Sequence, residues 1–174
     1  MPTFDAYEKA MSDALKNVAG IKHVEEYAND LSPSTLKKVA LRDSGILMVP
    51  LGGMPSREQP ATGQLAFDCR TGAFIVTRNA RGSIERTRQA RKLAREVMLM
   101  IQHNQWGLAD VHGAAIEKLE NRSSGKVDNE GFAIWLVVWK QTIYLDEELV
   151  DTSVVPTDVH VASTAGSSSQ VVPS

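Results

Sequence analysis

The segment that most constrains the fold is the run FAIWLVVWKQTIYL at residues 132–145. It is rich in β-branched and aromatic residues, which suit a pleated and buried surface, so it predicts a strand. Successive side chains of a strand point to opposite faces. One face then carries Trp135, Val137 and Trp139, and the other carries Ile134, Leu136 and Val138. Because both faces are apolar, both need cover.

A two-layer fold with helices on one side would cover only one face of this strand. The second face must then meet another chain, the C-terminal segment or a further layer of the same chain. Aromatic residues are favoured in interface cores, so we assign Trp135, Val137 and Trp139 as a possible interface between subunits. The alternative is a central strand of the chain's own sheet.

Two segments predict the main helices. Residues 83–102 repeat apolar residues at helical spacing and would form a helix about 30 Å long. Residues 3–18 show the same periodicity, with Thr3 as a cap and Gly20 as a stop. The apolar positions are Ala90, Leu93, Ala94, Val97, Met98 and Ile101 in the first segment, and Phe4, Tyr7, Met11, Leu15 and Val18 in the second. Ser32-Pro33 predicts a shorter helix that reaches Ala40.

The remaining segments predict strands and loops. Strands are expected at residues 22–27, 46–51, 64–79 and 114–121, and glycine- and proline-rich or polar loops at 52–63 and 123–131. Thr71-Gly72 makes 64–79 either a hairpin or one bulged strand. Helices do not alternate regularly with strands, which predicts an α+β fold: a mostly antiparallel sheet with two main helices packed on one face. We expect one domain over residues 1–149.

Residues 150–174 contain no aromatic side chain and much serine, threonine and valine. This composition predicts an extended or flexible C-terminal arm that could add to a neighbour's sheet.

The composition predicts no catalytic chemistry. The 174 residues have a formal net charge of -2 and a single cysteine, Cys69, which fits a reducing compartment. The four histidines lack metal-ligand spacing, and phosphate-loop and nucleophile motifs are absent from the sequence. No apolar run approaches the ~20 residues of a membrane helix. We therefore expect no enzyme activity, no cofactor, no metal and no membrane partner.

A basic stripe lies opposite the apolar face of the long predicted helix. It consists of Arg81, Arg88, Arg91, Lys92 and Arg95. Such a stripe can be a solvated helix face, a contact with an acidic subunit, or a surface for DNA phosphates. Without a base-reading motif, sequence-specific DNA binding is not expected.

The order of elements adds a family resemblance. An amphipathic helix precedes the apolar ILMVPLGG strand, and GQLAFDCRTGAFIVTRNARG leads into the long helix before the chain ends its core in FAIWLVVWKQTIYL. This layout over about residues 4–146 resembles the tail terminator proteins of Mu-like phages and, more distantly, those of lambda-like siphophages. A strand that ends in Arg-Asn before a helix, here Arg78-Asn79, is the shared motif.

The resemblance implies a non-enzymatic virion protein without a cofactor. It implies a homo-oligomer, a hexameric ring that caps the tail tube protein, stops its polymerisation and joins the head-tail connector. Genomic DNA would pass through the lumen without sequence-specific binding. The location implied is the head-proximal end of the tail, assembled in the host cytoplasm. As contact residues we assign the basic stripe together with Gly52, Gly53, Met54 and Arg57. Two alternatives are another head-tail neck or completion ring and a DNA-binding accessory protein.

Overall fold

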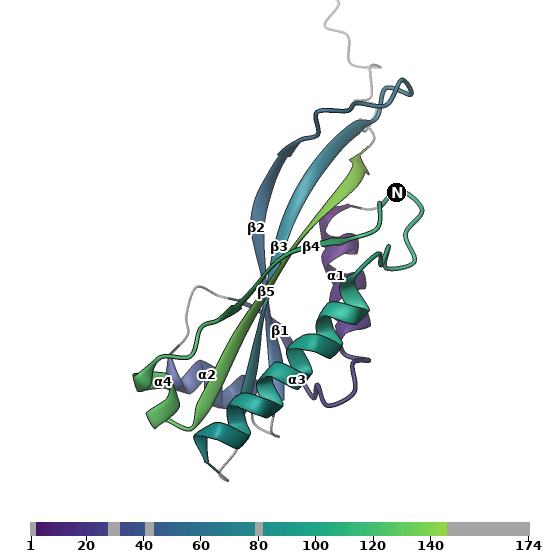
Figure 1. Ribbon diagram of the computed structural model, residues 1–174. Helices are drawn as coiled ribbons and strands as arrows, with labels where there is room; N and C mark the ends of the chain where they lie inside the picture. Colours follow the sequence, from purple (N-terminus) through teal and green to yellow (C-terminus); the bar gives the residue numbers. More distant parts are fainter. Residues whose placement is uncertain (1–2, 28–31, 41–43, 79–81, 146–174) are drawn as a thin grey trace, which may run out of the picture.

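The computed structural model describes residues 3–27, 32–40, 44–78 and 82–145. The described strands form one sheet in the order β1-β2-β3-β5-β4, and α1 and α3 lie on the same face of it (Figure 1). In chain order the elements are α1 (Phe4–Leu15), β1 (Val24–Glu26), α2 (Pro33–Val39), β2 (Ser44–Pro55), β3 (Leu65–Arg78), α3 (Ser83–Ile101), β4 (Ala115–Asn121), α4 (Gly125–Asn129) and β5 (Phe132–Leu145). Within this sheet only the β1–β2 pair is parallel. The predicted α+β fold with two main helices on one face is confirmed; the predicted arm from residue 150 lies outside the described residues.

The first helix is shorter than the sequence predicts. Thr3 caps it as expected, because its hydroxyl oxygen accepts from the Ala6 backbone N–H at 3.2 Å. The helix ends at Leu15 instead of residue 18, and the chain continues in tight turns to Gly20, whose φ is +93°. A Cβ at Gly20 would stand 2.8 Å from a Leu93 methyl group, so the absence of a side chain lets this turn pass close to α3.

β3 (Leu65–Arg78) is one continuous strand, which decides between the two alternatives predicted for this region. β3 pairs without interruption along β5, from Leu65 opposite Leu145 to Arg78 opposite Phe132. The bulge lies in β2, where three steps from Pro50 to Gly53 match only two steps in β3. The predicted loop at 52–63 was therefore wrong at its start, because β2 continues through Pro55. The predicted polar loop at 123–131 likewise contains the short helix α4.

The two faces of the sheet are covered unequally. The larger core packs α1 and α3 against the face that carries Val137 and Trp139. A smaller core on the other face packs α2 against Phe132 and Ile134. The sequence left three possibilities for what covers the second face of the sheet. Near Phe132 and Ile134 the cover is a further layer of the same chain, the helix α2. The smaller core consists of Leu36, Val39, Ala40, Leu47, Val76, Phe132 and Ile134.

Replacing Gly53 with alanine is expected to destabilise the fold by about 1–3 kcal/mol. A Cβ at this position would stand 2.4 Å from the Asp68 backbone oxygen and 2.6 Å from a Phe67 ring carbon, so the bulge would have to open. Gly125→Ala is a matched control because a Cβ there meets nothing within 4 Å. Urea unfolding of both variants tests this, and equal midpoints would contradict it.

Candidate assembly interface

Four residues of the predicted basic stripe lie on the exposed side of α3, whereas Arg81 lies outside the described residues. Arg95 is paired with Glu96, its Nη1 lying 2.7 Å from the carboxylate oxygen. Arg88, Arg91 and Lys92 are exposed and form no ion pair with any other residue that the structure describes. α3 therefore presents three positive charges that no described residue pairs.

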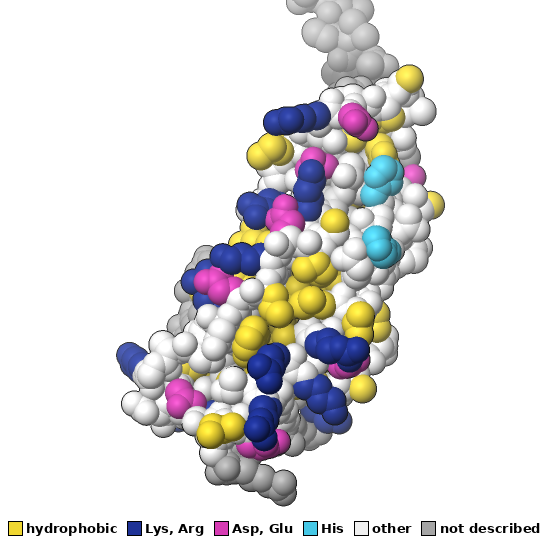
Figure 2. All heavy atoms as spheres, viewed as in Figure 1, with side chains coloured by type: hydrophobic (Ala, Val, Ile, Leu, Met, Phe, Trp, Pro, Cys, Tyr) yellow, Lys and Arg dark blue, Asp and Glu magenta, His cyan; other side chains and the backbone are white. Residues whose placement is uncertain are grey.

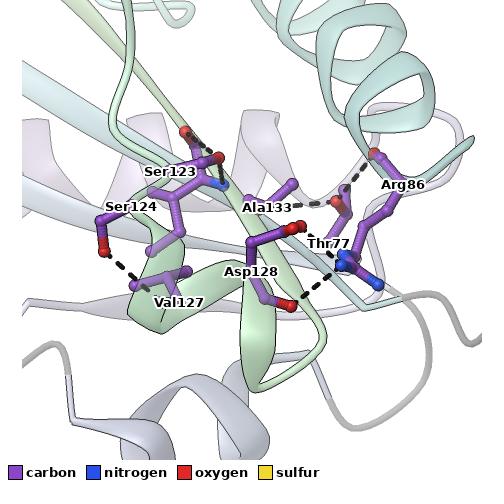
Figure 3. A network of polar contacts seen from close by, with 8 residues as sticks. Thr77, Arg86, Ser123, Ser124, Val127, Asp128 and Ala133 are labelled. Carbon is purple, nitrogen blue, oxygen red and sulfur yellow. Dashed lines mark hydrogen bonds and ion pairs between the residues drawn. The ribbon is translucent and has the colours of Figure 1, made fainter. Parts of the chain in front are cut away.

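Arg86 differs from these residues because it points inward. Its side chain is 7% exposed, and its Nη2 donates to the Asp128 carboxylate at 2.6 Å and to the Asp128 carbonyl at 3.0 Å (Figure 3). The contact holds α4 beside the start of α3. Sequence reasoning missed Arg86, although it lies four residues before Ala90 and so falls on the apolar side of the helix.

A groove of ≈ 500 Å³ lies between α3 and the start of α4, and we call it the α3–α4 groove. Arg88 and Arg91 stand on its α3 side together with Ile84, which is 71% exposed. Its lining residues are Ser83, Ile84, Thr87, Arg88, Arg91, Ser123, Ser124, Gly125 and Asp128. Farther along α3, the Gln102 side chain accepts from the Ile116 backbone N–H at 3.2 Å. The first turns of α3 and the residue that follows its last turn thus both lie on the β4 side of the sheet.

β4 is an edge strand that α3 leaves largely uncovered, since the helix lies mainly over β5 and β3 (Figure 1). The register places Leu119 opposite Val137 and Asn121 opposite Trp135, so these side chains are on the face that carries α3. Leu119 is 40% exposed, and the indole N–H of Trp135 has no acceptor within the described ranges. Figure 2 shows a strip of hydrophobic side chains on this face with lysine and arginine side chains beside it. We call this surface, from Arg88 and Arg91 to Leu119 and Trp135, the α3–β4 face.

The residues predicted as a contact loop lie elsewhere. Gly52, Gly53 and Met54 belong to β2, and Met54 is 66% exposed; Arg57 is exposed just after the strand. The two glycines line a mainly apolar pocket of ≈ 220 Å³ with Phe4 and Phe67, among others. This part of β2 lies toward the opposite end of the molecule from the first turns of α3 (Figure 1), so the structure does not bring the two predicted contact regions together.

The residues assigned as a possible ring interface are placed inside the chain. Val137 and Trp139 are fully buried in the larger core, and Trp135 is partly buried against it. Their surroundings are the side chains of α1 and α3, because the strand turns this face toward the helices. The surface near them that stays open is the α3–β4 face.

An acidic groove lies at the other edge of the sheet, between α1 and β1, and sequence reasoning missed it. It has a volume of ≈ 450 Å³, and we call it the α1–β1 groove. Among its lining carboxylates, Asp5, Glu8 and Glu26 form no ion pair with another described residue. Burial, and then the charges of Glu26 and Asp5, raise the pKa of Glu8 above its ordinary value. The groove therefore holds carboxylates that repel one another.

The described histidines and Cys69 lie apart from any metal-binding cluster of the described residues. Within the described ranges no group of three His, Cys, Asp or Glu residues could hold a metal ion. His112 lies beside Tyr144, its Nε2 being 2.9 Å from the Tyr144 hydroxyl. None of the described helices is both long and apolar enough to cross a membrane.

Cys69 is expected to react slowly with thiol reagents in the folded protein. Burial, followed by the charges of Asp68 and Glu8, raises its pKa from 9.0 to about 11. At pH 8 the higher pKa lowers the fraction of reactive thiolate by about 100-fold. Cys69 is also only 6% exposed, which limits access of the reagent to the sulfur. The rate of reaction with a disulfide dye, compared before and after unfolding in urea, checks this. A native rate equal to the unfolded rate would contradict it.

Comparisons with known proteins support the fold. No protein-family model matches the sequence, and a search of curated proteins finds no match. Among solved structures, a chain from the virion of a native gene transfer agent (GTA) particle is similar, with a TM-score of 0.50 and 13% sequence identity. The match covers 79% of this chain and 90% of that chain. At this identity the likeness is one of fold.

Proposed function

We propose that the protein is a structural component of a phage-like virion and acts as a tail terminator. The observation that carries the proposal is the fold shared with a chain of the GTA virion over most of both chains. The surfaces of the molecule agree with an assembly role, because α3 and the α1–β1 groove hold charges that form no ion pair with another described residue, and α3 leaves β4 largely uncovered. Such surfaces are features of proteins that bind other proteins.

The proposed mechanism is geometric capping. A tail tube exposes strand edges and loops that template the next ring, so a terminator must match that surface on one side only. Copies joined head to tail close into a ring, which we propose to be a hexamer. The β2 segment with Gly53, Met54 and Arg57 is our candidate for the tube contact.

Electron microscopy of particles made without the protein tests this function. A tail terminator is expected to leave overlong tubes without heads when it is missing. Open heads beside tails of normal length would indicate a neck or completion ring instead. Particles of normal form, or purified virions that lack the chain, would overturn the proposal.

A DNA-binding accessory role is a second candidate, favoured by the unpaired charges of Arg88, Arg91 and Lys92. This role predicts binding to arbitrary duplex DNA that weakens steeply as salt concentration rises. A fluorescence anisotropy titration with duplex DNA at two salt concentrations separates it from the terminator role. Absence of binding at low salt excludes the accessory role.

A further inference from the structure

We propose that the α3–β4 face of one copy binds the α1–β1 groove of a second copy, so that copies join head to tail. This inference rests on the proposed ring function and names the two surfaces that would make the ring. The partner is a second copy of this chain, because the chain itself carries both complementary surfaces.

Charge complementarity is the first argument. Arg88 and Arg91 on the α3–β4 face, and Lys92 next to them on α3, are exposed and have no ion pair inside the described part of the chain. The α1–β1 groove offers a matching set of three carboxylates without ion pairs there, which are Asp5, Glu8 and Glu26. Bringing the two sets together relieves repulsion within each one and adds attraction between them.

Apolar surface is the second argument. Leu119 is 40% exposed and Ile84 is 71% exposed, and both lie on the α3–β4 face. The partly buried Trp135 lies in the floor of that face beside the uncovered edge strand. An apolar strip with a basic rim fits a protein partner better than a nucleic acid backbone, which offers charge without a hydrophobic face.

The position of the two surfaces is the third argument. β1 and β4 are the opposite edges of the described sheet, and α1 and α3 lie on the same face of it. A contact between unlike edges is heterologous and can repeat from copy to copy until it closes. A two-fold dimer through α3 would instead set Arg88 and Arg91 of each copy against the same charges of the other.

Charge reversal tests the inference by sedimentation velocity. One variant carries Arg88→Glu, Arg91→Glu and Lys92→Glu, and a second carries Asp5→Lys, Glu8→Lys and Glu26→Lys. We expect each to weaken self-association at least about 100-fold, because like charges then face each other across the contact. An equimolar mixture of the two variants, and the chain with all six changes, are expected to associate again. Added salt is expected to weaken association of the wild type.

Controls keep these outcomes distinct. Thermal unfolding identifies a variant that fails to fold, and the neutral set Asp5→Asn, Glu8→Gln and Glu26→Gln then replaces the acidic reversal. Lys37→Glu, an exposed position on α2 outside both surfaces, is expected to associate like the wild type. A wild type that stays monomeric at millimolar concentration, reversed variants that associate normally, or a mixture that stays monomeric would each overturn the inference. Rings that form as proposed but have no effect on particles would instead refute the terminator function alone.

Discussion

Gln141→Leu is expected to lower the free energy of unfolding by about 3–5 kcal/mol, the largest loss from any single polar change in the described chain. Gln141 is 1% exposed in the middle of β5. Its Oε1 accepts from the Tyr7 hydroxyl at 2.9 Å and from the Trp106 indole N–H at 2.6 Å. Its Nε2 donates to the carbonyl of Asn104 at 2.8 Å and to that of His112.

The size of this effect follows from what the substitution leaves behind. Leucine has a similar volume but satisfies none of the four partners, and each buried polar group without a partner costs about 1–3 kcal/mol. Burial raises the pKa of Tyr7 above its ordinary range, so its hydroxyl remains a neutral donor that needs an acceptor. Gln141 thus ties α1 and the segment after α3 to β5.

Thermal unfolding measures this loss, which corresponds to a melting temperature about 6–20 °C lower for a chain of this size. Gln105→Leu provides the matched control, because Gln105 is exposed and is expected to change stability little. If Gln141→Leu melted within two or three degrees of this control, the four bonds would not contribute as argued.

Asp128→Ala is expected to cost about 2–4 kcal/mol, the second large effect. The substitution takes the Asp128 carboxylate away from the buried Arg86 guanidinium, and removing one partner of a buried ion pair is strongly destabilising. Asp128 itself is 38% exposed, so water reduces the loss below that of a fully buried pair.

Comparison with Arg86→Met shows whether the buried charge of Arg86 accounts for the stability that Asp128→Ala loses. Methionine keeps much of the packing and removes the buried charge, so this variant is expected to lose less stability than Asp128→Ala. Combining the two substitutions is expected to cost less than their sum, because the charge is already gone. Urea unfolding of the three variants checks the order, and strict additivity would contradict it.

Most of the fold could be predicted from local periodicity in the sequence. The alternation in residues 132–145 and the three-four spacing in residues 83–102 depend only on near neighbours, and both elements form close to their predicted bounds. The α+β arrangement followed from their order. The position of the bulge did not follow from local sequence. Thr71-Gly72 is compatible with a turn, and only the pairing with β5 shows that β3 continues straight through these two residues.

The site was less predictable because it depends on contacts between distant segments. Exposed Arg88 and Arg91 followed from the helix periodicity, but no local pattern shows that Arg86 pairs with Asp128, 42 residues away. In the sequence Gln141 is an ordinary polar residue of a predicted strand, but in the structure it accepts a hydrogen bond from Tyr7, which is 134 residues away in the chain. The acidic groove likewise joins α1 to β1, which no local pattern places side by side. The apolar residues of β5 were correctly expected to need cover on both faces, but the sequence did not identify α2 as part of it.

The open stretch of β2 has a consequence for how the protein behaves when it is abundant. β1 pairs only with residues Ile46, Leu47 and Met48, so the outer edge from Val49 to Pro55 has no neighbour among the described strands. Pro50 and Pro55 lack the N–H groups that an incoming strand would bind, and the bulge between them distorts the edge. Such an edge is a poor seed for amyloid-like stacking. We therefore expect little edge-to-edge aggregation through this stretch when the protein is concentrated.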